Sequence, residues 1–203
     1  MIERDVRRVG KRMTGEARRE QILTAARAGF AEGGYEGTTT DQVARAAGVS
    51  QPYVIRLFGS KQQLFLELYQ HVSTRILETF SAVRAGPDAG RMMGESYIGL
   101  VADRDLLRLL MHGFIAGSDP QIGSLARHTL AEVFRLFRDR TGGSEQEARD
   151  FLAQGMLINV LIATGALEHS ADELALAALC DCTIGPHRAG GTTESPGGDP
   201  SVT

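Results

Sequence analysis

The chain has 203 residues, a formal net charge of −3 and an apolar fraction of 42%. This length allows one sizeable core, or one core with a small satellite domain, and excludes a very large assembly within one chain. The longest segment without charge, 151–167, contains Gln154, Asn159 and Thr164. We interpret it as a buried helix rather than a membrane span, so no membrane partner is expected.

Charge is unevenly distributed along the chain. Residues 1–61 hold 11 Lys and Arg against 7 Asp and Glu, whereas residues 62–203 hold 11 against 18. A basic front on an acidic body suits a chain whose front meets a polyanion, although a basic arm can also be only a solvated tail. The arm lacks the apolar core and cleavage site of a secretory signal, which favours a cytoplasmic location.

Cysteine usage agrees with a reducing compartment. The only two cysteines, Cys180 and Cys182, offer neither a disulfide framework nor a four-ligand zinc site. Together with His187 they match no metal spacing, and buried or idle thiols are the favoured interpretation. We expect no metal and no cofactor.

The first helix is predicted by apolar residues at helical spacing, namely Ile22, Ala25, Ala26, Gly29 and Phe30. The pair Gly33-Gly34 is expected to end it.

Two short helices follow. Thr39 and Gln42 form a capping box for the second helix, and Gly48 ends it. Ser50 caps the third helix, whose first turn accepts Pro52 because no intrahelical partner is needed there.

A long fourth helix is expected from Ser60 to the break at Gly86-Pro87. No run with strand-like alternation follows; further helices are expected near 88–102, 104–116, 120–141, 145–168 and 171–183. From Gly185 onward the composition is Gly, Pro, Ser and Thr, which predicts a disordered tail.

The pattern within residues 40–59 predicts a helix-turn-helix. Its inward residues are expected to be Val43, Ala47, Val49, Val54 and Leu57, with Ala44 at the helix crossing. The outward side of the third helix then presents Gln51, Tyr53, Ile55 and Arg56 to a major groove. The alternative is that Tyr53 or Arg56 merely packs on the first or fourth helix.

These elements define the expected organisation. The fold is all-α, with an N-terminal three-helix DNA-binding domain containing the helix-turn-helix, followed by a larger helical ligand-binding and dimerisation domain. The expected boundaries are a basic flexible arm at 1–16, the DNA-binding domain at 17–61, the ligand-binding and dimerisation domain at 62–184 and the tail at 185–203.

Side chains of the second and third helices carry the expected DNA contacts. Arg56 suits guanine or a phosphate, and Gln51 suits adenine. Lys61, at the start of the fourth helix, is assigned to a phosphate. The full set of DNA-binding candidates is Thr39, Thr40, Ser50, Gln51, Pro52, Tyr53, Arg56 and Lys61.

The stretch from Gly37 to Lys61, GTTTDQVARAAGVSQPYVIRLFGSK, resembles the signature of the TetR family of bacterial transcriptional regulators. The resemblance covers about residues 17–70. Many members carry Tyr-x-Tyr-Phe where this chain has Ile55 and Leu57, so the phosphate-contacting hydroxyl is expected from Tyr53. The resemblance implies a homodimer, a near-palindromic double-stranded operator and a small-molecule effector whose binding tilts the fourth helix.

Segment 151–167 is apolar nearly all round, which indicates burial on two sides. A second copy of the chain is the simplest partner, the alternative being a helix wholly enclosed by its own subunit. The dimer-interface candidates are Phe151, Met156, Asn159, Val160, Ala163, Leu174 and Leu179.

A pocket is expected among the fourth to eighth helices, although Met and aromatic residues at helical spacing are more often plain core. His112 is its best polar candidate; the alternative is a histidine satisfied by a backbone carbonyl. The candidate pocket residues are Phe80, Met92, Met93, Tyr97, Met111, His112, Phe114, Phe134 and Phe137.

The sequence thus predicts a sequence-specific DNA-binding regulator, a repressor released from its operator by an unknown small molecule. The alternative is an architectural or protein-recruiting DNA-binding factor of the same fold without such a ligand. No nucleophile elbow, phosphate loop or His-Glu-x-x-His helix is present, so an enzyme is not expected.

Overall fold

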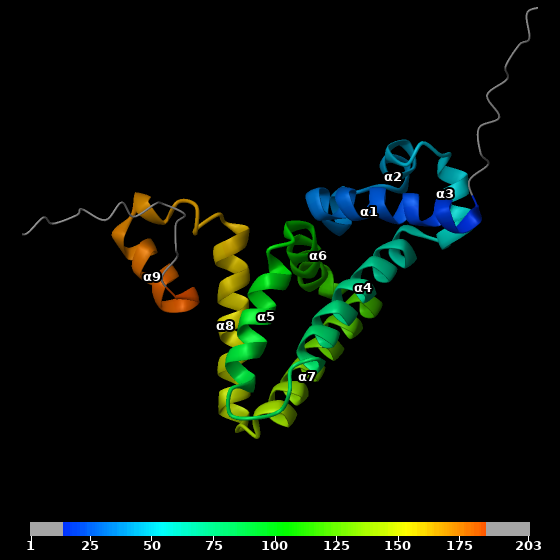
Figure 1. Ribbon diagram of the computed structural model, residues 1–203. Coiled ribbons are helices and arrows are strands. Elements are labelled where there is room, and N and C mark those ends of the chain that lie inside the picture. Colours follow the sequence, from blue (N-terminus) through cyan, green and yellow to red (C-terminus); the bar gives the residue numbers. More distant parts are fainter. Residues whose placement is uncertain (1–13, 186–203) are drawn as a thin grey trace, which may run out of the picture. The chain divides into compact units, whose positions relative to one another are not determined.

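The computed structural model describes residues 14–185, and within them it contains helices and no strand. The all-α fold expected from the sequence is confirmed. The basic residues before Thr14 and the polar tail with His187 lie outside the described residues. Figure 1 shows the elements, which in chain order are α1 (Gly15–Gly37), α2 (Thr40–Ala46), α3 (Gln51–Phe58), α4 (Lys61–Ser81), α5 (Ala89–Val101), α6 (Arg104–Ile115), η1 (Ala116–Ser118), α7 (Pro120–Thr141), α8 (Glu145–Ala163), η2 (Ser170–Asp172) and α9 (Leu174–Ile184).

The chain divides into two compact units, Met1–Gly155 and Met156–Thr203, whose boundary falls within α8. In the first unit α1, α2 and α3 form a three-helix head at the start of α4, and α7 runs along α4 (Figure 1). We call residues 14–61 the head and residues 62–155 the body. None of the helices between residues 14 and 185 combines the length and apolar character that crossing a bilayer requires.

Helix α1 is built on a buried apolar face and bends where the sequence predicts an end. Ile22, Ala26 and Phe30 are fully buried on that face. Gly34 has a φ of 67°, which L side chains rarely adopt, and helical structure resumes beyond it as far as Gly37. The predicted break is therefore present at Gly34 as a kink, and a short helical segment follows it.

Helix α4 joins the head to the body. Ser60 caps it by accepting a hydrogen bond from the backbone N–H of Gln63 at 3.0 Å. In its first half Phe65 lies against Phe30 of α1, with ring centroids 5.2 Å apart. Farther along, Ser73 accepts a buried hydrogen bond from Thr129 of α7 at 3.0 Å. One continuous helix is therefore shared by two cores.

Tyr69 of α4 fits closely against α6. A β-carbon placed on Gly113 of α6 would lie 2.1 Å from the Tyr69 ring, so only glycine allows this approach. Burial raises the pKa of Tyr69. Its buried hydroxyl has no hydrogen-bond partner within residues 14–185, so the residue serves mainly as an aromatic ring.

Aromatic rings join four helices of the first unit. Phe80 of α4 contacts Tyr97 of α5 with ring centroids 5.8 Å apart and Phe151 of α8 at 5.6 Å. Phe137 of α7 stacks on Phe151 at 4.7 Å. These rings fill space within this unit by packing on one another.

The second unit begins with the end of α8. This helix ends at Ala163, five residues before the boundary predicted from the sequence. Gly165 follows with a φ of 69°, and the N–H of Ala166 bonds the carbonyl of Leu161 at 2.8 Å. The positive φ of Gly165 and this hydrogen bond form a C-cap that ends α8 and changes the direction of the chain. A small core then forms from Leu161, Ala166 and Cys180.

We predict that Gly113→Ala lowers the free energy of unfolding by about 1–3 kcal/mol, because the added methyl group must displace the Tyr69 ring. Gly94→Ala in α5 is the matched control, because no atom lies within 4 Å of its β-carbon position. This control is expected to be neutral or stabilising by up to about 1 kcal/mol. Urea unfolding followed by circular dichroism measures both; equal midpoints would contradict the close α4–α6 contact.

Candidate nucleic-acid interface

Helix α2 begins with the capping box predicted from the sequence. The backbone N–H of Gln42 donates to the Thr39 hydroxyl at 3.2 Å, and the Thr39 N–H donates to the Gln42 side-chain oxygen at 2.8 Å. Two backbone donors at the helix start are thereby satisfied. The short helix α2 thus has a defined first residue and a defined direction.

A tight turn sets the angle between α2 and α3. Gly48 has a φ of 61°, and the N–H of Val49 bonds the carbonyl of Ala44 at 2.9 Å. The carbonyl of Ser50 then accepts from the N–H groups of Tyr53 and Val54. The Ser50 side chain makes no capping bond, so α3 starts from backbone contacts alone.

The inner side of the helix-turn-helix is apolar and closed. Val43, Ala47 and Val54, each predicted to face inward, are 1% exposed. Val49 and Leu57, also predicted inward, are only half-buried, and Phe58 takes a buried position instead. Burial of this side leaves the opposite side of α3 facing solvent.

The exposed strip of α3 consists of Gln51, Pro52, Ile55 and Arg56. Its members recur one turn apart, as a single helix face requires. Of the outward residues predicted from the sequence, Gln51, Ile55 and Arg56 lie on this strip. Tyr53 is half-buried beside it. The DNA-binding candidates predicted from the sequence do not include Ile55, although its four-residue spacing from Gln51 was a usable signal.

Two contacts orient polar groups of the strip. The side-chain amide of Gln51 donates to the hydroxyl of Thr40 on α2 at 3.1 Å. The guanidinium of Arg56 lies 4.9 Å from the centroid of the Tyr53 ring. Thr40 and Tyr53 therefore hold the two side chains best suited to base edges and phosphates.

Lys61 holds the head together. Its ammonium donates to the backbone carbonyl of Tyr35 at 2.9 Å and lies 4.6 Å from the centroid of that ring. The contact joins the start of α4 to the end of α1. The phosphate contact expected of Lys61 stays a prediction, and this lysine would have to leave Tyr35 to make it.

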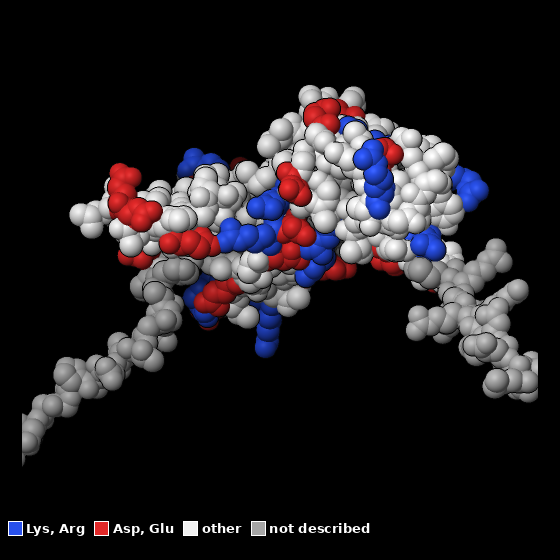
Figure 2. All heavy atoms as spheres, turned by 90° about the horizontal axis from the view of Figure 1, so that it is seen from above, with Lys and Arg blue, Asp and Glu red and all other residues white. Residues whose placement is uncertain are grey.

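The described head is nearly balanced in charge. Residues 14–61 hold six Lys and Arg against five Asp and Glu, and Figure 2 shows both signs interspersed on the face it presents. Each of the six cations has a partner in the chain: Arg18 with Gln21, Arg19 with Glu67, Arg27 with Asp103, Arg45 with Asp41, Arg56 with Tyr53, and Lys61 with Tyr35. Most of the net positive charge of residues 1–61 belongs to the segment before Thr14, which holds five Lys and Arg against two Asp and Glu.

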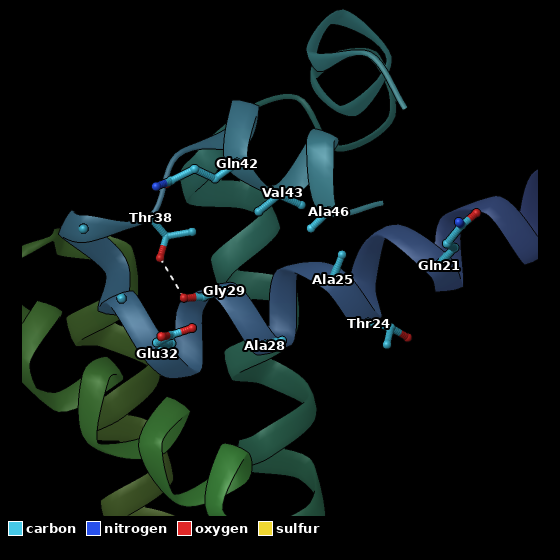
Figure 3. A pocket seen from close by; sticks show the side chains of 12 residues that line it. Gln21, Thr24, Ala25, Ala28, Gly29, Glu32, Thr38, Gln42, Val43 and Ala46 are labelled. Atoms are coloured by element: carbon cyan, nitrogen blue, oxygen red, sulfur yellow. Dashed lines mark hydrogen bonds between the residues drawn. The ribbon is translucent and has the colours of Figure 1, made fainter. Parts of the chain in front are cut away.

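A groove lies between α1 and α2, outside the region where a pocket was expected. Its volume is about 960 Å³, and small residues such as Ala25, Ala28 and Gly29 line much of it (Figure 3). The Thr38 hydroxyl donates to the Gly29 carbonyl at 2.9 Å, as the dashed line shows. The groove reflects close helix packing over glycine and alanine.

The predicted pocket residues occupy different environments. Phe80, Met93, Tyr97 and Phe137 are buried, and three of these rings belong to the packed aromatic group described above. Met92 is 40% exposed. The half-buried members are Met111, His112, Phe114 and Phe134.

His112 packs against the bend in α1. A β-carbon on Gly34 would lie 2.8 Å from the His112 Nδ1. The ring therefore lies at the contact between α6 and the head. Its role in a ligand pocket stays a prediction.

The predicted dimer residues also differ in their surroundings. Phe151 belongs to the first unit and stacks on Phe137. In the second unit Val160, Leu174 and Leu179 are apolar and exposed. Asn159 is buried, with an amide contact to the Met156 sulfur at 3.8 Å, and Ala163 is exposed.

The two thiols lie apart from any cluster of ligands. Cys180 is buried and Cys182 exposed, and each Sγ contacts a backbone carbonyl. Among residues 14–185 no group of three or more His, Cys, Asp or Glu side chains is placed to hold a metal ion.

Comparison with known proteins adds independent information. Residues 22–68 match the family model for bacterial regulatory proteins of the tetR family. The HTH-type transcriptional repressor AcnR of Corynebacterium efficiens is 43% identical over 63 residues, which are 31% of this chain and 34% of that protein. The HTH-type transcriptional activator FasR of Mycolicibacterium smegmatis is 37% identical over 82 residues, which are 40% and 37% of the two chains. The match thus spans about a third of the length of these relatives.

A solved structure resembles most of the fold. A transcriptional regulator from Rhodococcus sp. Rha1 aligns with a TM-score of 0.61 at 22% identity, covering 82% of this chain and 93% of that one. At this identity the likeness concerns the arrangement of helices.

We predict that Thr39→Ala lowers the free energy of unfolding by about 1 kcal/mol, because the capping box loses its hydroxyl acceptor. Thr39→Ser keeps that acceptor and should unfold like the parent chain. Differential scanning calorimetry of the three proteins measures the effect. An equal loss in the serine and alanine variants would contradict the capping role.

Proposed function

We propose that the chain is a sequence-specific DNA-binding regulator of transcription of the TetR type, since residues 22–68 match the family model for bacterial regulatory proteins of the tetR family. Its target is a near-palindromic double-stranded operator, it acts as a homodimer in the cytoplasm, and it works as a repressor. The observation that carries the proposal is the exposed strip of α3, which stands opposite the closed apolar side of the helix-turn-helix.

The chemistry of the strip suits a major groove. An α-helix fits the width of that groove, where each base pair presents its own pattern of donors, acceptors and methyl groups. Gln51 offers an amide and Arg56 a guanidinium, and neither is sequestered in the core. The bond from Gln51 to Thr40 restricts the amide before DNA arrives, so less side-chain freedom is lost on binding.

Homodimerisation is supported by exposed apolar residues of the second unit. Leu174 is 91% exposed and Val160 46%, values that a partner surface would reduce. Two copies related by a two-fold axis would present two strips to half-sites roughly 34–36 Å apart. This doubling explains how a helix of eight residues could select an operator.

Release by a small molecule requires a link between body and head, and several contacts could provide it. Arg27 of α1 makes two contacts of 2.5 Å with Asp103, which also caps α6 through the Leu106 N–H. Lys61 bonds the Tyr35 carbonyl of α1, and the next residue of α4, Gln62, donates to Asp119, the cap of α7, at 2.7 Å. A ligand that shifts α6 or α7 would therefore move groups bonded to the head.

Asp103 is ionised in this link. Burial, the largest single influence, acts to raise the pKa of Asp103, but the hydrogen bonds from Arg27 and Leu106 and the charge of Arg27 together lower it. Since the pKa of Asp103 is lower in the folded chain, the contact stabilises the fold above the ordinary pKa of an aspartate. The stabilisation is lost as the pH falls through the lower value of the folded chain.

Repression is the direction we propose, in keeping with the repressor AcnR, although the similar protein FasR is named an activator. A second candidate is a DNA-binding architectural or protein-recruiting factor without an effector. The mutual packing of Phe80, Phe137 and Phe151 favours it, because rings that fill space leave less room for a ligand.

The proposal is tested by selecting bound duplexes from a randomised pool with the full chain at modest ionic strength. We expect a near-palindrome to be enriched, and Gln51→Ala to weaken its binding by about 5- to 100-fold while binding to random duplex changes little. Gln70→Ala, an exposed glutamine of α4, is the control and should bind like the parent chain. Failure to enrich any duplex would refute DNA recognition by this chain.

The Arg27–Asp103 contact gives a separate prediction. Asp103→Asn keeps a capping side chain but removes the charge that holds Arg27, so the head is less fixed before it binds DNA. The two side chains are 38% and 34% exposed, so we expect a modest loss of operator affinity, about two- to fivefold.

If the Arg27–Asp103 contact causes the loss of operator affinity, the effects of substituting its two residues should not add. Arg27→Gln should weaken binding similarly, and the double variant no further. Glu95→Gln, which breaks the exposed Arg91–Glu95 pair of α5, is the control and should change nothing. Fluorescence anisotropy with the selected duplex measures all four; additive losses in the double variant would show that the two residues act independently.

A further inference from the structure

Ile55 is the one large apolar side chain on the exposed strip of α3. It is 38% exposed, whereas Val54 and Phe58, on the buried side of α3, are 1% and 7% exposed. Gln51 lies one turn before it and Arg56 directly after it on the same strip. An apolar side chain thus lies between two polar ones on the exposed strip of α3.

Neither helix formation nor the core explains this residue. Isoleucine is a weaker helix former than alanine or the long polar residues, because its branched β-carbon loses rotamer freedom in a helix. The inner side of α3 is closed by Val54 and Phe58 without it. Exposing apolar surface to water is unfavourable, so covering that surface with a partner is favourable.

The chemistry of the major groove identifies what covers it. Nucleobase edges there carry hydrogen-bond donors and acceptors, and the one apolar group among them is the 5-methyl of thymine. We propose that Ile55 packs against a thymine methyl group and so specifies a T·A pair in each half-site. This inference rests on the proposed function, because it requires α3 to enter the groove.

The geometry also places that thymine. Gln51 and Ile55 are four residues apart on α3, which corresponds to about 6 Å along a helix. Base pairs are spaced by about 3.4 Å. The thymine read by Ile55 should therefore lie about one or two base pairs from the pair that Gln51 contacts.

Deoxyuridine tests the contact at a single methyl group. It pairs like thymine but lacks the 5-methyl, so each thymine of the selected operator is replaced in turn, symmetrically in both half-sites. We expect one position at which the replacement weakens binding by the parent chain by about fourfold per half-site. In Ile55→Ala the same replacement should have no effect, because the side chain that contacts the methyl is gone.

Two further variants separate this contact from general effects. Ile55→Val keeps a branched apolar side chain and should retain part of the sensitivity to deoxyuridine. Leu130→Ala removes an apolar side chain of similar exposure, 37%, from α7 and should keep the full sensitivity. Urea midpoints close to that of the parent chain for Ile55→Ala would show that its folding is intact.

The outcomes distinguish this inference from the proposal on which it rests. Suppose that the parent chain binds a selected operator but deoxyuridine weakens binding at no position, or that it weakens binding by Ile55→Ala as much as by the parent chain. The thymine contact is then wrong and the DNA-binding function stands. If no duplex is enriched at all, the proposed function fails and the thymine contact fails with it.

Discussion

Phe65 and Tyr69 occupy successive turns of α4 and stack with ring centroids 6.0 Å apart. Phe65 contacts Phe30 and Tyr35 of α1, whereas Tyr69 closes against Gly113 of α6. A continuous row of rings on one helix therefore connects the core of the head with that of the body. Because packed interiors transmit displacement rather than absorb it, the direction of the α3 strip depends on this row.

Local signals in the sequence predicted most of the helices. Thr39, Gly48 and Ser60 mark boundaries that the structure confirms, because caps and positive-φ glycines depend on neighbouring residues only. At Gly34 the predicted break is present as a kink, but helical structure resumes after it as far as Gly37. The same reasoning was wrong at the end of α8, which stops at Ala163, just before Gly165.

The candidate site was predictable in outline, since helical periodicity separates the buried Val54 from the exposed Gln51 and Arg56. Contacts between distant residues were not predictable, because no local pattern encodes them. Lys61 bonding Tyr35 and Arg27 bonding Asp103 are of this kind, and both join the head to α4 or α6. The predicted pocket and dimer residues depend on a ligand or a second chain, so one subunit alone leaves them as predictions.

The internal pairing of cations in the head has a consequence for how DNA would be searched. A protein that neutralises phosphates displaces condensed counterions, and this release supplies most of the affinity for arbitrary sequence. Of the six cations in residues 14–61, Arg19, Arg27 and Arg45 already form ion pairs with carboxylates, so few are left to neutralise phosphates. DNA binding by these residues would thus depend only weakly on salt, and the head would dissociate quickly from unrelated chromosomal sites. The head would therefore contribute to sequence specificity more than to non-specific affinity.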